Sequence, residues 1–216
     1  MRCYRTKLRS SDNLELSSVM AIPNEGKNFP CVVAFHGFES TKDSTKYIML
    51  ENKFVDSGIA FLRFDFRGCG ESLGDKYDID GRFDDALSAI RFARNFDNID
   101  KSRIGVLGSS FGGSLAAVVS LYEELRFIIM LATPAVVKIK GIATKDVFSK
   151  GNNPPVLFVH GDSDELVPME SSVQMYAVAS EPKKIEIIRG ADHRFSDKNH
   201  LLYVVQLCGD WAVKYI

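Results

Sequence analysis

The sequence has few cysteines, and their placement excludes two classes of protein. Only four occur among 216 residues, at Cys3, Cys31, Cys69 and Cys208. They form no Cys-x-x-Cys pair and no cluster with histidine, so a disulfide scaffold and a cysteine-rich metal site are both excluded. Scattered, reduced thiols are typical of cytoplasmic proteins. We therefore expect a cytoplasmic protein that needs no metal ion and no cofactor.

The sequence also lacks an excess of charge and a long apolar run. Its 27 basic and 28 acidic residues give a net charge of −1, which offers no strong field to nucleic acid or an anionic membrane. No apolar run is long enough to span a bilayer. Residues 1–7 are charged but no apolar segment follows them, so we expect no signal peptide. Binding to nucleic acid or to a membrane is not expected.

Strand-like and helix-like segments alternate along the whole chain, without a repeat or linker. This alternation predicts one α/β domain over residues 1–216, with a mostly parallel sheet and helices on both of its faces. In such sheets, functional residues gather in the loops at the carboxyl ends of the strands. The expected strands are 5–9, 14–22, 31–35, 59–64, 103–107, 126–131, 156–160 and 184–188, and the expected helices are 46–57, 80–95, 111–123, 171–179 and 198–214.

One strand-to-helix junction carries the pattern Gly-x-Ser-x-Gly at residues 108–112. In this context the pattern predicts a nucleophile elbow, a sharp turn that exposes the hydroxyl of Ser110. Gly108 and Gly112 fit because side chains there would collide across so tight a turn. The simpler interpretation is that Ser110 caps the following helix. Ser109 is the rival nucleophile, but it lies one residue away from the centre of the pattern.

Four more polar loops follow predicted strands. The first of these loops is His36-Gly37-Phe38, and the other three are residues 65–72, 160–168 and 190–195. With these motifs in this order, the chain resembles serine hydrolases of the α/β-hydrolase fold, in the group of small esterases and serine peptidase-like hydrolases. The resemblance covers nearly the whole chain. It implies an α/β-hydrolase fold with a mostly parallel sheet of about eight strands.

The resemblance also implies roles for individual residues. Ser110 matches the nucleophile, Asp164 the acid and His193 the base, in the order that this fold uses. The backbone N–H groups of Phe38 and Phe111 match the oxyanion hole. The chemistry needs such a set, because a serine hydroxyl is a weak nucleophile until an adjacent base takes its proton. A buried carboxylate then fixes the tautomer of the histidine.

Other polar residues in these loops have simpler interpretations. We expect structural roles for His36 and His160, and a surface or packing role for His200. Alternatives to Asp164 as the acid are found nearby, at Asp162, Glu165 and Asp192. Of these, Asp162 and Asp192 are expected to shape their loops. Arg67, in the Asp-x-Arg-Gly-x-Gly-x-Ser loop, is expected to brace that loop rather than to bind a substrate.

The segment at residues 134–155 occupies the position where many relatives carry a large helical lid. Here it is short, with a helix-like patch at 136–148, and has room for one small helix. The predicted function is therefore that of a serine carboxylester hydrolase, acting on small or accessible acyl esters through an acyl-enzyme intermediate. An amide, peptide or thioester hydrolase with the same triad is the alternative, and a non-catalytic binding protein is disfavoured. The expected partner is a small-molecule ester, and a homodimer is possible.

Overall fold

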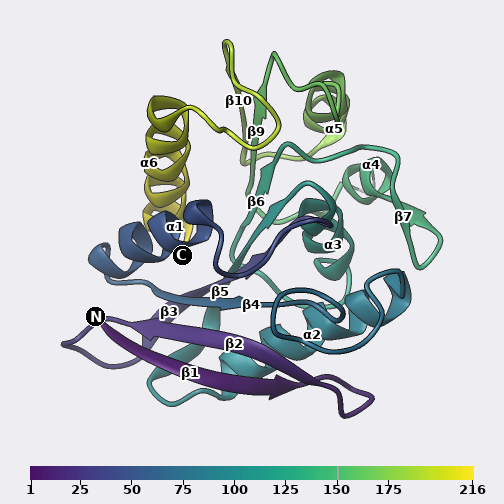
Figure 1. Ribbon diagram of the computed structural model, residues 1–216. Helices are drawn as coiled ribbons and strands as arrows, with labels where there is room; N and C mark the ends of the chain where they lie inside the picture. Colours follow the sequence, from purple (N-terminus) through teal and green to yellow (C-terminus); the bar gives the residue numbers. More distant parts are fainter. Residues whose placement is uncertain (150) are drawn as a thin grey trace.

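The computed structural model describes residues 1–149 and 151–216, and an eight-stranded sheet forms its centre (Figure 1). The strand order is β1-β2-β4-β3-β5-β6-β9-β10. β1 pairs with β2, and β2 with β4, in antiparallel fashion, whereas all other neighbours are parallel. The strands span Arg2–Arg9 (β1), Glu15–Ile22 (β2), Phe29–Phe35 (β3), Ala60–Phe64 (β4), Ile99–Ser109 (β5), Ile128–Leu131 (β6), Val156–Gly161 (β9) and Lys183–Ile188 (β10).

Helices cover both faces of this sheet. One face packs against α1 (Thr45–Asp56) and α6 (Lys198–Tyr215), which also contact each other. The other face packs against α2 (Ile79–Asn95), α3 (Phe111–Val119), α4 (Thr144–Phe148) and α5 (Glu170–Val178). Figure 1 shows α1 and α6 on one side of the sheet and α3, α4 and α5 on the other. The predicted α/β class and the mostly parallel sheet are confirmed.

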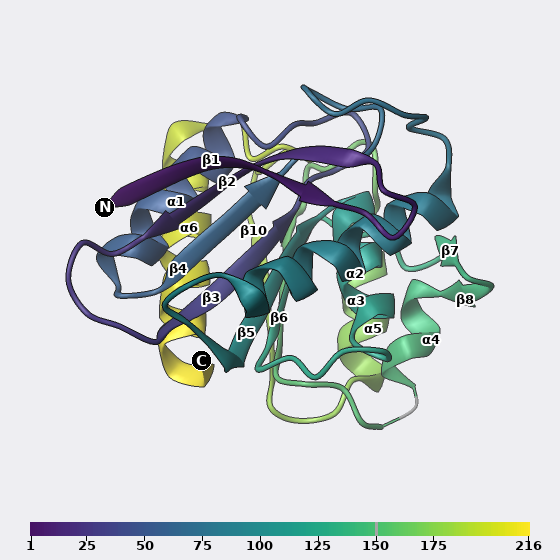
Figure 2. The ribbon, with the colours of Figure 1, turned by 90° about the horizontal axis from the view of Figure 1, so that it is seen from below.

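Burial of the strands follows their place in the sheet. Every residue of β3, β4, β6 and β9 is buried, as expected for parallel strands that are covered on both faces. β1 lies at an edge and is mostly exposed (Figure 2). It turns into β2 at Asn13, which adopts a φ of 68°, and Leu14 N–H donates to Ser10 Oγ at 3.0 Å. The predicted opening antiparallel pair is therefore present.

The predicted helix-like patch at 136–148 was wrong over its first half. Residues Lys138–Ile139 (β7) and Ile142–Ala143 (β8) form a small antiparallel hairpin, and only α4 is helical. The reason is a local turn, because Lys140 and Gly141 both take positive φ, at 50° and 76°. The hairpin and α4 pack beside α2 and α3. Among the described residues, no helix is both long and apolar enough to cross a membrane.

Candidate active site

Ser110 lies at the junction of β5 and α3 in a strained backbone conformation. Its φ of 54° and ψ of −121° are unusual for a residue with a side chain. Ser110 is formally the N-cap of α3, yet its side chain makes no capping hydrogen bond. Its backbone N–H donates to Leu131 O at 2.8 Å, which fixes the turn against β6. The hydroxyl is therefore not used to cap the helix, contrary to the simpler interpretation of the sequence.

The glycines around Ser110 are required by the close approach of backbone segments. A Cβ on Gly108 would lie 2.2 Å from Gly112 O, and a Cβ on Gly112 would lie 2.1 Å from Phe35 O. Real Cβ atoms do not approach so closely, and the contacts are with backbone that cannot move aside. The tight packing expected from the Gly-x-Ser-x-Gly pattern is present, and it places α3 directly over the end of β3.

The loop after β3 lies against this elbow. A Cβ on Gly37 would lie 3.4 Å from both Ser109 O and Ser110 Cβ. The rings of Phe38 and Phe111 meet edge to face, with centroids 5.6 Å apart. The structure therefore brings together the two residues whose backbone N–H groups match an oxyanion hole, and it places both beside Ser110.

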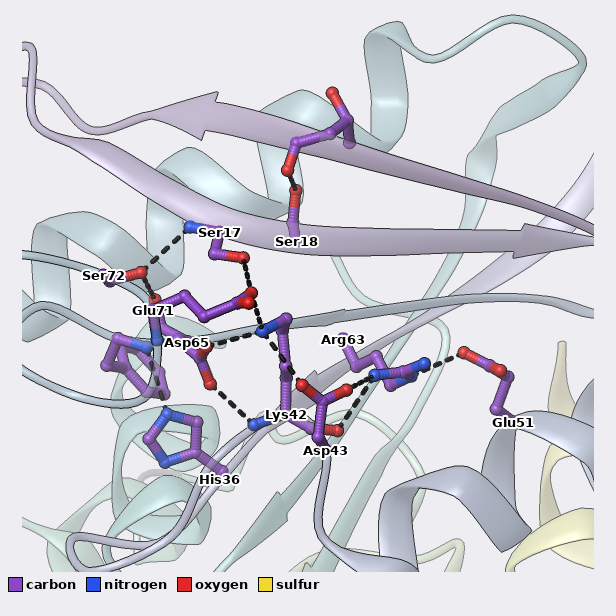
Figure 3. A network of polar contacts seen from close by, with 12 residues as sticks. Ser17, Ser18, His36, Lys42, Asp43, Glu51, Arg63, Asp65, Glu71 and Ser72 are labelled. Carbon is purple, nitrogen blue, oxygen red and sulfur yellow. Dashed lines mark hydrogen bonds and ion pairs between the residues drawn. The ribbon is translucent and has the colours of Figure 1, made fainter.

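Figure 3 shows the partly buried network of polar contacts around this loop. Phe66 N–H donates to His36 Nε2 at 3.0 Å, so His36 carries its proton on Nδ1, which donates to Gly37 O at 2.7 Å. Asp65 accepts hydrogen bonds from the Lys42 backbone N–H at 2.7 Å and from Lys42 Nζ at 2.8 Å. Burial lowers the pKa of His36 to about 4, and the backbone contact with Gly37 opposes this only in part. His36 is a neutral structural residue, as the sequence predicted.

Arg67 is also structural. It makes a two-pronged pair with the fully buried Asp85, from Nε to Oδ2 at 3.0 Å and from Nη2 to Oδ1 at 2.8 Å. Nη1 donates to Asp78 Oδ2 at 2.6 Å. Hydrogen bonding to Asp85 is the main cause that raises the pKa of Arg67. Its donors hold the loop to α2 and to Asp12 in the turn between β1 and β2, as expected for a brace.

The loop after β9 brings Asp164 to the loop after β10. His193 Nδ1 donates to Asp164 Oδ2 at 2.7 Å. The other oxygen, Oδ1, accepts the backbone N–H groups of Leu166 at 2.9 Å and Val167 at 2.8 Å. The Asp164 side chain is fully buried, whereas that of His193 keeps 15 % of its surface exposed. A buried carboxylate thus orients an imidazole whose other nitrogen remains free to act.

A second histidine holds the same carboxylate. His160 Nε2 donates to Val167 O at 3.0 Å and lies 3.1 Å from Asp164 Oδ2, while Nδ1 accepts from Ser172 Oγ at 2.7 Å. Burial is the main cause that lowers the pKa of His160, so the ring stays neutral. His160 has the structural role predicted for it. Its direct contact with the acid could not be predicted from the sequence.

The alternative acids are engaged elsewhere. Asp162 Oδ1 accepts from Gly190 N–H at 2.6 Å, and Asp192 Oδ1 accepts from the N–H groups of Arg194 at 3.1 Å and Ser196 at 2.8 Å. Glu165 is exposed. Of the four candidates, the structure joins His193 to Asp164.

Ser110 and His193 line one cavity of about 750 Å³. None of the described residues 134–149 and 151–155 lines it, so the segment at the lid position leaves it uncovered. The described residues contain no group of three or more His, Cys, Asp or Glu side chains that could hold a metal ion.

Lys46 also lines the cavity, and sequence reasoning missed it. Lys46 Nζ donates to Ser109 Oγ at 2.8 Å, next to the nucleophile position. The one available signal was a lysine in the first turn of a helix, a turn that carries no acidic residue. Ser109, the rival nucleophile, is buried and occupied by this contact.

Arg82 was missed as well. It is fully buried on α2, and its guanidinium carbon lies 4.5 Å from the centroid of Phe38 and 5.6 Å from that of Phe111. Nη2 donates to Cys69 Sγ at 2.8 Å, whereas Nε and Nη1 have no partner in the described structure. Arg82 therefore packs against the rings of Phe38, in the loop after β3, and Phe111, at the start of α3.

The chain is similar to known proteins in sequence and in fold. The family model for X-Pro dipeptidyl-peptidase (S15 family) matches residues 12–148. The uncharacterized protein YfhR of Escherichia coli O157:H7 is 30% identical over 163 residues, which cover 67% of this chain and 57% of that protein. The chain thus spans less than two thirds of the length of this curated relative.

Solved structures share the fold. The esterase domain of a Rhodothermus marinus protein superposes with a TM-score of 0.82 at 19% identity, over 100% of this chain and 99% of that one. XC6422 from Xanthomonas campestris, described as an α/β serine hydrolase without a lid, gives a TM-score of 0.81 at 17% identity, over 100% and 96% of the two chains. The chain belongs to the X-Pro dipeptidyl-peptidase (S15) family and has the α/β-hydrolase fold of serine hydrolases.

Proposed function

We propose that this protein is a serine carboxylester hydrolase that works through an acyl-enzyme intermediate. One observation carries the proposal. The free hydroxyl of Ser110 stands on a strained turn in the same open cavity as His193, and His193 is bonded to the buried carboxylate of Asp164. A nucleophile, a base and an orienting acid in this relation define acyl-transfer chemistry.

The first half-reaction forms the acyl-enzyme. His193 Nε2 takes the proton from Ser110 Oγ as that oxygen attacks the ester carbonyl carbon, and the resulting imidazolium is stabilised by Asp164. The backbone N–H groups of Phe38 and Phe111 donate to the oxyanion of the tetrahedral intermediate. The intermediate collapses when His193 returns the proton to the departing alcohol. In the second half-reaction His193 activates water, which attacks the acyl carbon and releases the acid and Ser110.

The cavity favours small or exposed esters over peptide amino termini. Release of a dipeptide requires a site for the terminal ammonium group, and a carboxylate is the natural partner for such a group. Glu39 is the one carboxylate residue that lines the described cavity, and it is paired with Lys76 at 3.0 Å.

The cytoplasmic location and the homodimer both stay predictions from the sequence. The four free cysteines are consistent with the first of them.

The test compares wild type with Ser110→Ala and Ser109→Ala. With 4-nitrophenyl esters as substrates, we expect Ser110→Ala to lower kcat by at least about 10³-fold, because the nucleophile is lost. A fluorophosphonate probe should label wild type and Ser109→Ala but leave Ser110→Ala unlabelled. Equal esterase rates in wild type and Ser110→Ala, or labelling at Ser109, would overturn the proposal.

The same proteins separate ester hydrolysis from its alternatives. Matched 4-nitrophenyl ester, 4-nitroanilide and acyl-CoA substrates with one acyl group compare ester, amide and thioester turnover directly. We expect the ester to give the highest kcat/KM. A higher value for the anilide or the thioester would reassign the reaction class but keep the triad. Failure of the probe to label wild type would instead support a non-catalytic binding protein.

A further inference from the structure

Lys46 places a positive charge beside the nucleophile. It is the second residue of α1, and its Nζ lies 2.8 Å from the hydroxyl of Ser109, the residue before Ser110. The same ammonium lies 5.5 Å from the ring centroid of Phe195, in the loop that carries His193. Lys46 therefore stands between the elbow and the loop of the base, and it faces the cavity that both of them line.

This charge has no carboxylate partner in the described part of the chain. Burial is the main cause that lowers the pKa of Lys46 to about 8; Cys208 and Asp192 oppose this change, whereas the charge of Arg194 adds to it. No acidic residue lies in the first turn of α1, and a cation at a helix N-terminus also opposes the helix dipole. The fold thus keeps a desolvated ammonium at an unfavourable place, as proteins do at functional sites.

An unpartnered hydroxyl group lies at the start of the same helix. Ser44 is the N-cap of α1, yet its Oγ makes no capping hydrogen bond. That oxygen is buried without a partner, and Ser44 also lines the cavity. A buried hydroxyl without a partner is costly unless a ligand completes it. This end of α1 therefore presents an ammonium to the cavity, with an unpartnered buried hydroxyl close to it in the chain.

The other charged residues that line the cavity also favour a negatively charged ligand. Arg194 lines the cavity, whereas the carboxylate of Glu39 is paired with Lys76 at 3.0 Å. Since an ammonium and a hydroxyl group both donate hydrogen bonds, their common ligand is an anionic oxygen.

We infer that Lys46 and Ser44 form a subsite for a carboxylate carried by the substrate, so that the preferred esters are half-esters of short dicarboxylic acids. This inference rests on the proposed ester hydrolysis for its reaction, but not for its binding step. Because Lys46 contacts the residue next to Ser110, only a short acyl chain is needed to join the scissile carbonyl to the bound carboxylate. Lys46 is thus a specificity-determining residue.

A binding experiment tests the subsite without turnover. Monomethyl glutarate is titrated into Ser110→Ala by NMR, and methyl 5-methylhexanoate serves as the neutral analogue of similar shape. We expect Lys46→Met in the Ser110→Ala background to raise the Kd of the anion by about 10- to 100-fold, as loss of a charged hydrogen bond implies. Lys53→Met removes the same charge from the same helix, outside the cavity, and should leave that Kd unchanged.

Turnover gives a second readout in proteins with active Ser110. Mono-4-nitrophenyl glutarate is compared with 4-nitrophenyl 5-methylhexanoate, and the spontaneous rates are subtracted. We expect wild type to prefer the anionic ester, Lys46→Met to lose that preference through KM, and Lys46→Arg to keep part of it. The preference should also fall as the pH rises through about 8, since Lys46 then loses its charge.

The outcomes separate the two proposals. An anion Kd that is the same in Lys46→Met and its parent, or neutral binding as tight as anionic binding, overturns the subsite whatever the catalytic result. Binding that depends on Lys46 in a protein whose Ser110 performs no hydrolysis supports the subsite and overturns the proposed function instead.

Discussion

Acid should destabilise this protein through His36, which the fold holds in its neutral form. The ring is 1 % exposed, and both of its nitrogens are used, by Phe66 N–H and by Gly37 O. A proton on Nε2 would break the bond from Phe66. Burial accordingly lowers the pKa of His36 to about 4, whereas an unfolded histidine titrates near 6.5.

The sign and size of the effect follow from linkage. Between pH 6.5 and pH 4 the unfolded chain binds a proton at His36 and the native chain does not, so stability falls as the pH falls. Each pH unit in this window lowers the free energy of unfolding by about 1.4 kcal/mol. From pH 6.5 to pH 4 the free energy of unfolding falls by about 3 kcal/mol in total. None of this loss occurs above pH 6.5.

The assay is urea unfolding of wild type and His36→Gln over a pH series. Glutamine does not titrate, and its amide oxygen can accept the hydrogen bond from Phe66 N–H. Between about pH 7.5 and about pH 5, wild type should lose about 2 kcal/mol more than the variant, whatever their difference at neutral pH. Parallel curves for the two proteins would refute the reasoning. So would an NMR titration in which the His36 ring protonates above pH 6.

Three further substitutions test the site and its supports. Asp164→Asn should lower kcat by about 10⁴-fold, because His193 loses its orienting carboxylate, and steady-state esterase kinetics would measure it; a loss below tenfold would argue against this acid. Asp85→Asn should lower the free energy of unfolding by about 3–5 kcal/mol in urea titrations, since Arg67 loses its one fully buried carboxylate partner and keeps only the more exposed Asp78 and Asp12. A loss below about 1 kcal/mol would mean that Arg67 finds other partners. Gly112→Ala should lower stability by at least about 1–3 kcal/mol in thermal unfolding and also lower activity, because its Cβ meets backbone at 2.1 Å. An unchanged Tm would show that the elbow can relax.

Much of the fold could be predicted because its signals are local. The buried strands β3 and β9 are continuous apolar runs in the sequence. The elbow is marked by glycines at positions where any side chain would clash with neighbouring backbone. Asp164 and His193 could be placed at strand ends because parallel strands share one functional edge. Their 2.7 Å contact then follows from the topology, which sets β9 beside β10.

The features that were missed depend on tertiary contacts. Lys46 lies beside Ser109 because α1 packs on one face of the sheet, and no spacing in the sequence predicts this contact. Arg82 is a charged residue on a helix that was predicted to be amphipathic. In the structure it is completely buried, and its guanidinium lies beside the rings of Phe38 and Phe111. The hairpin at Lys140 and Gly141 depends on two positive φ values, in a segment that was predicted to be helix-like although it is rich in β-branched residues.

The position of the β7–β8 hairpin and α4 has a kinetic consequence. These elements pack beside α2 and α3 and contribute no described residue to the cavity wall. For the proposed hydrolysis we therefore predict that these elements impose no gating step and that the chemical steps set the turnover rate. Without a hydrophobic cover to displace, a lipid–water interface offers no activation, so rates should follow the concentration of dissolved monomeric ester and be insensitive to solvent viscosity.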